Sequence, residues 1–322
     1  PVEGYVAKRS AAATKTDAPI IETPQSMSVV TKDEIERRNS DTIKSAVSYT
    51  PGVIPSRYFD KRYDDVVIRG FTDSDYYLDG LKTASNQFSF TIVEPYGLER
   101  IELLRGPSST LYGQSSTGGI INSTSKRPTE EPVRELKLTL GNNEKYQGAF
   151  DFGGSLDSNG QWLYRLTGLV RESETQTDFV RDDRIYIAPS IEWRPTEDTS
   201  ITVFANYLKD DLGNSGGTAA FLPSSGTALP NPNGKIDRST YGGEPSSDFY
   251  EREQFFIGYD FEHRFNDTLA FKQNIRYQES EFDSQTGFGL GFSDPEKRLL
   301  NRAPFGARGD TKSLTADNKI EL

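Results

Sequence analysis

From residue 134 onward, hydrophobic and polar residues alternate with a period of two. Leu136, Leu138 and Leu140 alternate with Lys137 and Thr139. This is the pattern of a strand with one apolar and one polar face. It predicts about eight strands, many of ten or more residues, which is longer than the five or six typical of soluble sheets. The alternation recurs at residues 146–152, 162–171, 185–193, 255–262 and 269–277, less regularly at 200–208, and again from about 312.

The connections between these strands are unequal. Short turns are expected near residues 142–143, 157–160, 195–198 and 266–267, and long loops over 209–250 and 284–312. Aromatic residues stand near the ends of the apolar faces, namely Trp162, Trp193, Phe255 and Tyr277. Short turns at one end, longer loops at the other and aromatic girdles are typical of outer-membrane β-barrels.

The first 130 residues have a different pattern, which predicts a mixed α/β unit. Residues 26–30 form a short strand, and Thr31 and Glu34 have the spacing of a capping box that begins a helix ending near Arg38. A second helix is expected over 41–48, followed by short strands at 65–69, 76–78 and 100–104. We therefore expect one domain over residues 1–130 and a second over 131–322.

The residue types narrow the possible chemistry. There is no cysteine, so no disulfide or thiolate metal site can form, and His263 is the only histidine. A catalytic triad or a zinc site would depend on that one residue, so we expect neither an enzyme nor a metal centre. The net charge of −11, from 48 acidic and 37 basic residues, argues against a nucleic-acid partner.

The average polarity of the chain does not indicate disorder. Mean hydropathy is −0.65 and 34% of residues are hydrophobic, yet 11% are aromatic, whereas disordered chains are poor in aromatic residues. No run of 18 apolar residues exists, which excludes a transmembrane helix but leaves a barrel possible. A soluble β-sandwich is the alternative, and it would have to explain long strands that carry a charged face.

The barrel must be wide enough to hold the first domain, and this requirement sets the number of its strands. An eight-stranded barrel encloses little more than its own side chains, whereas a barrel of about 22 strands can hold a plug. We therefore expect a mixed α/β plug domain followed by an antiparallel transmembrane β-barrel, with about eight of 22 strands present. The rest of the barrel would then lie beyond Leu322.

A series of short motifs in the first half resembles the plug of TonB-dependent siderophore receptors. Further motifs narrow the similarity to the ferric-hydroxamate branch, the ferrichrome and ferrioxamine receptors. The plug motifs are TPQS (23–26), SYTPGV (48–53), IRGF (68–71), YLDG (77–80), ERIE (99–102), RGP (105–107), LYG (111–113), GG (118–119) and SKRP (125–128). Those of the second half are YRLTGL (164–169), IAP (187–189), WRP (193–195), PNGK (232–235), FNDT (265–268) and SDP (293–295).

This resemblance implies a pocket for the ferric complex between the plug apices and the barrel wall. Arg57 matches a plug arginine near the iron-chelating oxygens, where a guanidinium suits the partial charge of hydroxamates. Gln87 and Phe88 match a second apex, and Phe221 and Phe288 match aromatics of the barrel lining. Packing or membrane anchoring is the alternative role for each aromatic, and Arg57 could be a solvated loop charge.

Several positions depart from the ferrichrome receptor pattern. The stretch between Phe71 and Tyr77 is about four residues shorter, and two tyrosines of the lining are replaced by Ala219 and Leu290. These departures imply a pocket of different shape, which a linear hydroxamate such as ferrioxamine fits at least as well as ferrichrome.

Two further arginines, Arg69 and Arg105, match plug residues that face glutamates on the barrel wall in this family. Buried charges need such partners. We expect the matching acids to lie beyond Leu322.

The resemblance also implies partners and a location. We expect a monomer in the bacterial outer membrane, in contact with lipid, that binds a ferric siderophore and TonB, the latter through a segment before or near Pro1. Because the siderophore itself holds the iron, no cofactor is expected. The alternatives are another cargo (catecholate siderophore, ferric citrate, cobalamin or, least of all, haem) or a soluble β-rich binding module.

Overall fold

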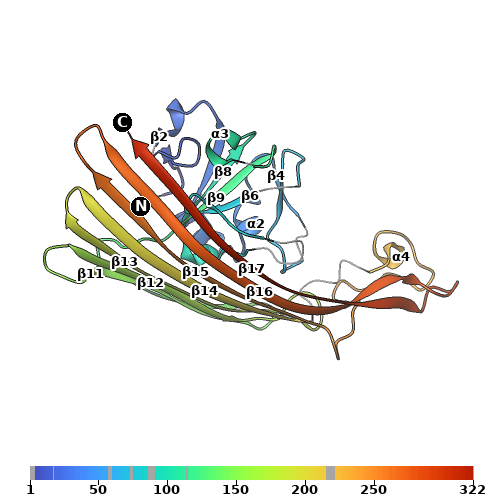
Figure 1. The fold of residues 1–322 in the computed structure, drawn as a ribbon. Coiled ribbons are helices and arrows are strands. Elements are labelled where there is room, and N and C mark those ends of the chain that lie inside the picture. Colours follow the sequence, from blue (N-terminus) through green and yellow to red (C-terminus); the bar gives the residue numbers. More distant parts are fainter. Residues whose placement is uncertain are drawn as a thin grey trace.

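The computed structural model describes residues 4–16, 18–56, 60–72, 75–85, 91–113, 115–214 and 222–321. An N-terminal α/β unit, the plug, lies against one face of a long curved sheet, the wall (Figure 1). The change between them falls at residues 126–132, between the last strand of the plug and the first strand of the wall. Within the described residues, no helix is long and apolar enough to cross a membrane.

The centre of the plug is a five-stranded sheet with the order β3-β8-β9-β6-β7. Its pairs are antiparallel except for β6 and β9, which are parallel. The bounds are β3 Ser26–Thr31, β6 Asp75–Leu78, β7 Leu81–Lys82, β8 Leu98–Arg105 and β9 Gly119–Ser125. Two smaller sheets pair β1 (Arg9–Ser10) with β2 (Ala18–Pro19) and β4 (Val53–Pro55) with β5 (Val66–Ile68).

Short helices connect these strands, and the predicted capping box is present. Helix α1 spans Lys32–Arg37, with the Thr31 hydroxyl accepting from the Glu34 amide and the Glu34 carboxylate accepting from the Thr31 amide. Helix α2 spans Ile43–Ala46 and is shorter than predicted, because Thr42 caps it on one side and Val47 ends it on the other. The remaining helical turns are η1 (Ile20–Glu22), η2 (Pro95–Gly97) and α3 (Ser109–Tyr112).

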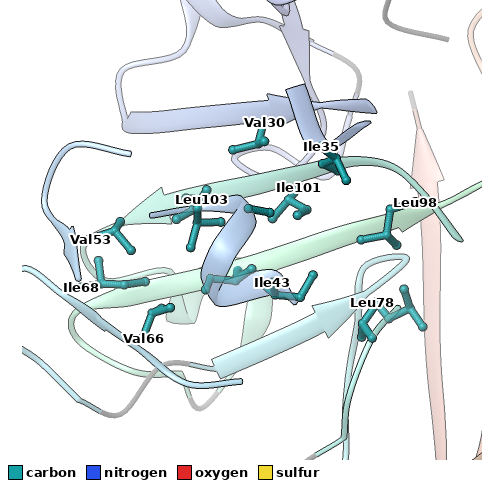
Figure 2. Packing of buried hydrophobic residues seen from close by; sticks show 14 of the residues in the cluster. Val30, Ile35, Ile43, Val53, Val66, Ile68, Leu78, Leu98, Ile101 and Leu103 are labelled. Carbon is teal, nitrogen blue, oxygen red and sulfur yellow. The ribbon is translucent and has the colours of Figure 1, made fainter. Parts of the chain in front are cut away.

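The plug has an ordinary apolar core between its sheet and its helices. Ile101 and Leu103 of β8 and Ile68 of β5 are fully buried, and Ile43 of α2 is almost so. Figure 2 shows these side chains packed in one cluster with those of α1 and β3. Burial of this apolar surface stabilises the plug as it stabilises soluble domains.

The wall consists of eight antiparallel strands in sequential order, as the alternation predicted. Their bounds are β10 Val133–Gly141, β11 Lys145–Ser155, β12 Trp162–Glu172, β13 Val180–Thr196, β14 Thr199–Gly213, β15 Phe249–Arg264, β16 Ala270–Phe292 and β17 Leu300–Glu321. The turns after β11, β13 and β15 are short, whereas the longest connection, which holds α4 (Ser224–Thr227), follows β14. We call these the turn end and the loop end of the wall.

One predicted loop, 284–312, is mostly strand. Residues up to Phe292 stay paired with β17, including Thr286 with Phe305 and Gly287 with Pro304. The resulting two-stranded ribbon extends beyond the rest of the wall at the loop end (Figure 1). The glycines of this stretch break the side-chain alternation, but they do not prevent the backbone hydrogen bonds that define a strand.

The two faces of the wall differ sharply in chemistry. Leu136, Leu138 and Leu140 point away from the plug and are more than 70% exposed. Facing the plug, Arg252 and Arg276 are almost completely buried. The wall is therefore apolar outside and carries buried charged residues inside, together with a few apolar ones such as Tyr186 and Phe256. An apolar outer face and a polar inner face are the arrangement of a membrane-spanning barrel strand.

Candidate functional site: the plug and the inner face of the wall

Four of the five predicted ligand-contacting residues, Arg57, Gln87, Phe88 and Phe221, lie outside the described residues. The fifth, Phe288, is on the β16–β17 ribbon, where its half-buried ring meets Phe305 edge-on with 5.6 Å between centroids. The described residues therefore do not bring this group together, and its role in ligand binding stays a prediction.

Arg69 and Arg105 lie beside each other on the plug. A Cβ on Gly52 would stand 3.9 Å from Arg105 Nε and 4.0 Å from Arg69 Cγ. Arg105 donates to the Ser28 hydroxyl and to the Pro51 carbonyl, at 2.7 and 3.1 Å. Burial, and then the positive charge of Arg69, lower the pKa of Arg105.

Within the part of the chain that the structure describes, neither guanidinium forms an ion pair with a carboxylate. Two adjacent arginines without an acid between them favour acidic partners elsewhere. The expected pairing with glutamates beyond Leu322 stays a prediction.

Buried charged residues of strands β13, β14 and β15 bind the plug to the wall. Arg184 on β13, Asp210 on β14 and Arg252 on β15 stand opposite one another in adjacent strands, close to the loop end. Asp210 binds both arginines; its distance to Arg184 Nε is 2.6 Å. Arg184 also binds Glu94 of the plug at 2.8 Å, and Arg252 donates to the carbonyl of plug residue Arg62 at 2.9 Å.

Two glutamines of the wall bind the plug backbone as another strand would. Gln254 on β15 donates to the Ile92 carbonyl and accepts from the Ile92 amide, both at 2.9 Å. Gln278 on β16 makes the same pair of bonds with Ala84, at 3.1 and 3.2 Å, and donates to the Thr91 hydroxyl. Both side chains are buried. Thus the plug residues on either side of 86–90 are held by hydrogen bonds to the wall.

A second charged cluster lies toward the turn end. Asp151 on β11 is fully buried between Arg165 on β12 and Lys126, the residue that follows plug strand β9. Lys126 Nζ also lies 4.2 Å from the centre of the Tyr96 ring. Burial lowers the pKa of Lys126, and the charge of Asp151 opposes that shift.

Inside the plug, Lys44 fixes the segment after residues 57–59. Its ammonium donates to the carbonyls of Asp60 and Tyr63, at 2.6 and 2.7 Å, while the Asp64 carboxylate accepts from the amides of Ile43 and Lys44. Burial lowers the pKa of Lys44 and raises that of Asp64. A buried charge with several partners rigidifies the backbone to which it binds.

These fastening residues were not predicted individually. The period-two pattern does place charged side chains on the inner face of the wall. Which of them meet depends on the register between strands, and that cannot be read from one strand at a time. The described residues contain no group of three or more His, Cys, Asp or Glu that could hold a metal ion. The arrangement is suited to holding a domain within a polar wall.

Known proteins share both halves of this arrangement. Residues 19–120 match the family described as "TonB-dependent Receptor Plug Domain". The chain is 40% identical over 301 residues to the ferrichrome outer membrane transporter/phage receptor of Escherichia coli, covering 92% of this chain and 40% of that protein. It is 38% identical over 327 residues to the ferrioxamine receptor of Yersinia enterocolitica, covering 100% of this chain and 45% of that protein.

Solved structures share the fold. The ferripyoverdine receptor of the outer membrane of Pseudomonas aeruginosa superposes with a TM-score of 0.88 at 23% identity, over 98% of this chain and 42% of that one. The chain thus spans less than half the length of these proteins, which bear the names of a transporter and receptors and not of enzymes. The chain belongs to the TonB-dependent receptors of the outer membrane, of which it contains the plug and eight strands of the wall.

Proposed function

We propose that the full-length protein binds a ferric hydroxamate siderophore and imports it by TonB-coupled transport. Relatives whose names include ferrichrome or ferrioxamine match this chain at 36–40% identity over at least 92% of its length. In this proposal residues 1–130 form the plug and residues 131–322 the first part of the barrel of a monomer in outer-membrane lipid.

The observation that carries the transport proposal is the polar interface between plug and wall. The wall residues that form hydrogen bonds and ion pairs with the plug are mostly arginines, aspartates and glutamines. Within the described residues, buried apolar contacts are confined to Phe256 of β15, which joins the core of the plug, and to a cluster in which Ile92 and Tyr96 of the plug pack against wall residues such as Tyr186 and Leu208. The polar groups of the interface can bind water when the plug shifts, so the apolar surface exposed by the movement would be limited to these two contact regions. We infer that TonB supplies the energy for this shift by strand addition to an N-terminal segment of the receptor.

Ligand binding is assigned to the loop end of the wall. We place the ferric complex against Arg57, Gln87 and Phe88 of the plug, with Phe221 and Phe288 from the wall. A guanidinium beside hydroxamate oxygens supplies charge-assisted hydrogen bonds, and the aromatics supply apolar contact area. Because the siderophore saturates the iron, the protein contributes no metal ligand and needs no cofactor.

Calorimetric titration of the full-length receptor tests this assignment. Ferrioxamine B and ferrichrome are expected to bind, whereas a ferric catecholate and ferric citrate are not. The gallium complex of the same hydroxamate should bind equally well, since the protein does not touch the metal. Binding of the catecholate or the citrate complex alone would overturn the hydroxamate assignment.

Two substitutions locate the pocket. Arg57→Ala should weaken binding of the hydroxamate about tenfold, the loss expected for one charge-assisted contact of roughly 1.4 kcal/mol. Phe288→Leu should weaken it less, and Phe265→Leu, an exposed phenylalanine at the turn end, should leave it unchanged. Equal affinities for wild type and Arg57→Ala would show that the pocket lies elsewhere.

A further inference from the structure

In the row of charged residues on β13, β14 and β15, the carboxylate of Asp210 binds two arginines, one from each neighbouring strand. Asp210 and Arg252 have no measurable exposure and Arg184 is 4% exposed. The register aligns Arg184 with Asp210, and Asp210 with Arg252. Asp210 accepts from Arg184 through both carboxylate oxygens, at 2.6 and 3.0 Å, and it accepts from Arg252 as well.

Each arginine continues to a different segment of the plug. Arg252 reaches the carbonyl of Arg62, and Arg62 itself is tied by a bidentate ion pair to Asp60. Arg184 reaches Glu94, whose other carboxylate oxygen accepts from the Tyr96 amide. Segment 60–64 follows the proposed ligand contact at Arg57, and segment 91–96 follows those at Gln87 and Phe88.

We propose that Asp210 couples these two plug segments through the wall and is a positioning residue for ligand binding. The proposal rests on the ligand pocket proposed above. Without the carboxylate, two buried guanidinium groups would face each other with no charge between them, so each would turn away and release its plug segment. Asp210 itself lies on the wall and is not placed in contact with ligand.

Each of the two segments is also held by hydrogen bonds of its own, which do not involve Asp210. Lys44 holds the carbonyls of Asp60 and Tyr63, and Gln254 holds Ile92. These contacts fix each segment separately. Lys61 of the first segment also binds Asp182 of β13, at 2.8 Å. Asp210 differs from these contacts because it joins both segments to one carboxylate through its two arginines, and a ligand that touches both apices would require that relation.

The wall contains a matched control. Asp151 is also fully buried, also binds two cations, and also joins adjacent wall strands to the plug through Lys126. It lies toward the turn end and has no contact with segment 60–64, and its partner Lys126 meets segment 91–96 only at the ring of Tyr96. Asp151→Asn and Asp210→Asn therefore remove the same charge from equivalent surroundings, with only the second acting on the proposed pocket.

Hydrogen exchange measured by mass spectrometry on the full-length receptor, without siderophore, tests the coupling. Asp210→Asn should speed exchange in peptides that cover both segments, whereas Asp151→Asn should leave segment 60–64 unchanged. The milder Arg184→Lys should loosen 91–96 alone and Arg252→Lys 60–64 alone, because lysine keeps the charge and loses the second hydrogen bond. An Asp210→Asn protein that loosens one segment or none, or an Asp151→Asn protein that loosens both, would overturn the proposal.

Titration with ferrioxamine B supplies the functional measurement. If the coupled arrangement falls to about a tenth of the population, the apparent affinity falls about tenfold, so Asp210→Asn should bind about tenfold more weakly and Asp151→Asn within twofold of wild type. Equal affinity in wild type and Asp210→Asn would contradict the positioning role. Should wild type itself bind no hydroxamate, the proposed function fails, while the exchange pattern still decides whether Asp210 couples the segments.

Discussion

The plug and the wall place their apolar side chains on opposite sides. In the plug, Ile101 and Leu103 are buried at the centre and the surface is polar. In the wall, Leu138 and its neighbours lie on the outside, and charged residues such as Arg252 face inward. Both follow one rule, that apolar groups avoid water, applied to a folded domain and to a sheet whose outer face we propose to meet lipid.

The opposite placement of apolar side chains in plug and wall accounts for the chemistry of the interface between them. Ion pairs and hydrogen bonds make up much of the contact between the plug and the inner face of the wall, beside the apolar packing of Phe256 and of the cluster around Tyr186. Buried ion pairs need both partners but add little net stability. Such an interface specifies one position for the plug at little net gain in stability, which suits the plug movement that we propose.

The largest expected effect comes from breaking the interface at one buried charge. Asp151→Asn leaves Lys126 and Arg165 without their shared carboxylate and should lower the free energy of unfolding of the receptor by about 3–5 kcal/mol. Denaturant unfolding in lipid vesicles, followed with a probe on the plug, measures it. The double variant Asp151→Asn/Lys126→Met should recover part of the loss, and a single variant as stable as wild type would contradict the assigned charge balance.

The second effect is the difference in stability loss between one leucine in the core of the plug and one on the outer face of the wall. Leu103→Ala creates a cavity in the plug and should cost about 2–5 kcal/mol. Leu138→Ala, the same change on the outward face of β10, should cost much less, because lipid fills the space. Parallel denaturant titrations in vesicles measure both, and equal losses would show that Leu138 packs against protein.

The third effect tests the direction of the wall faces. Leu138→Lys puts a charge on the proposed lipid side and should destabilise the barrel by about 2–4 kcal/mol near the membrane centre. Thr139→Lys, one residue along β10 and facing inward, is the matched control and should be tolerated. Folding yields into vesicles report both, and a reversed order would mean that the two faces have been exchanged.

The smallest effect concerns the rim of the wall. Trp162 and Trp193 are paired across β12 and β13, with ring centres 5.6 Å apart and an interplanar angle of 17°. Trp162→Leu keeps an apolar side chain and should cost about 0.5–1.5 kcal/mol through loss of the aromatic contact. The Trp193 fluorescence should shift with it, whereas an unchanged spectrum would show that the pair does not form.

Part of this structure could be predicted from the sequence, because the pattern itself is local. The alternation at Leu136–Leu140 predicts a strand and its outward face, and Thr31 with Glu34 predicts a helix start; all of these are present. The ribbon of β16 and β17 was predicted as a loop, since Gly287, Gly289 and Gly291 carry no alternation.

For the interface, the sequence predicts the kind of residue on the inner face of the wall but not which residues pair. The same alternation indicates that Arg184, Asp210 and Arg252 face inward, but their meeting depends on the strand register. That register includes an irregularity between Val180 and Asp183, which no period reveals. The predicted ligand contacts at Arg57, Gln87, Phe88 and Phe221 came from family resemblance and fall outside the described residues, so they remain predictions.

Uptake of radioactive iron by whole cells tests the central claim most directly. Cells that lack their own hydroxamate receptors would express the full-length protein and receive labelled ferrioxamine B, with and without a functional TonB. The account predicts accumulation only when both the receptor and TonB are present, and its loss when TonB is removed although surface binding persists. Accumulation without TonB, or none with TonB while another ferric chelate enters, would contradict it.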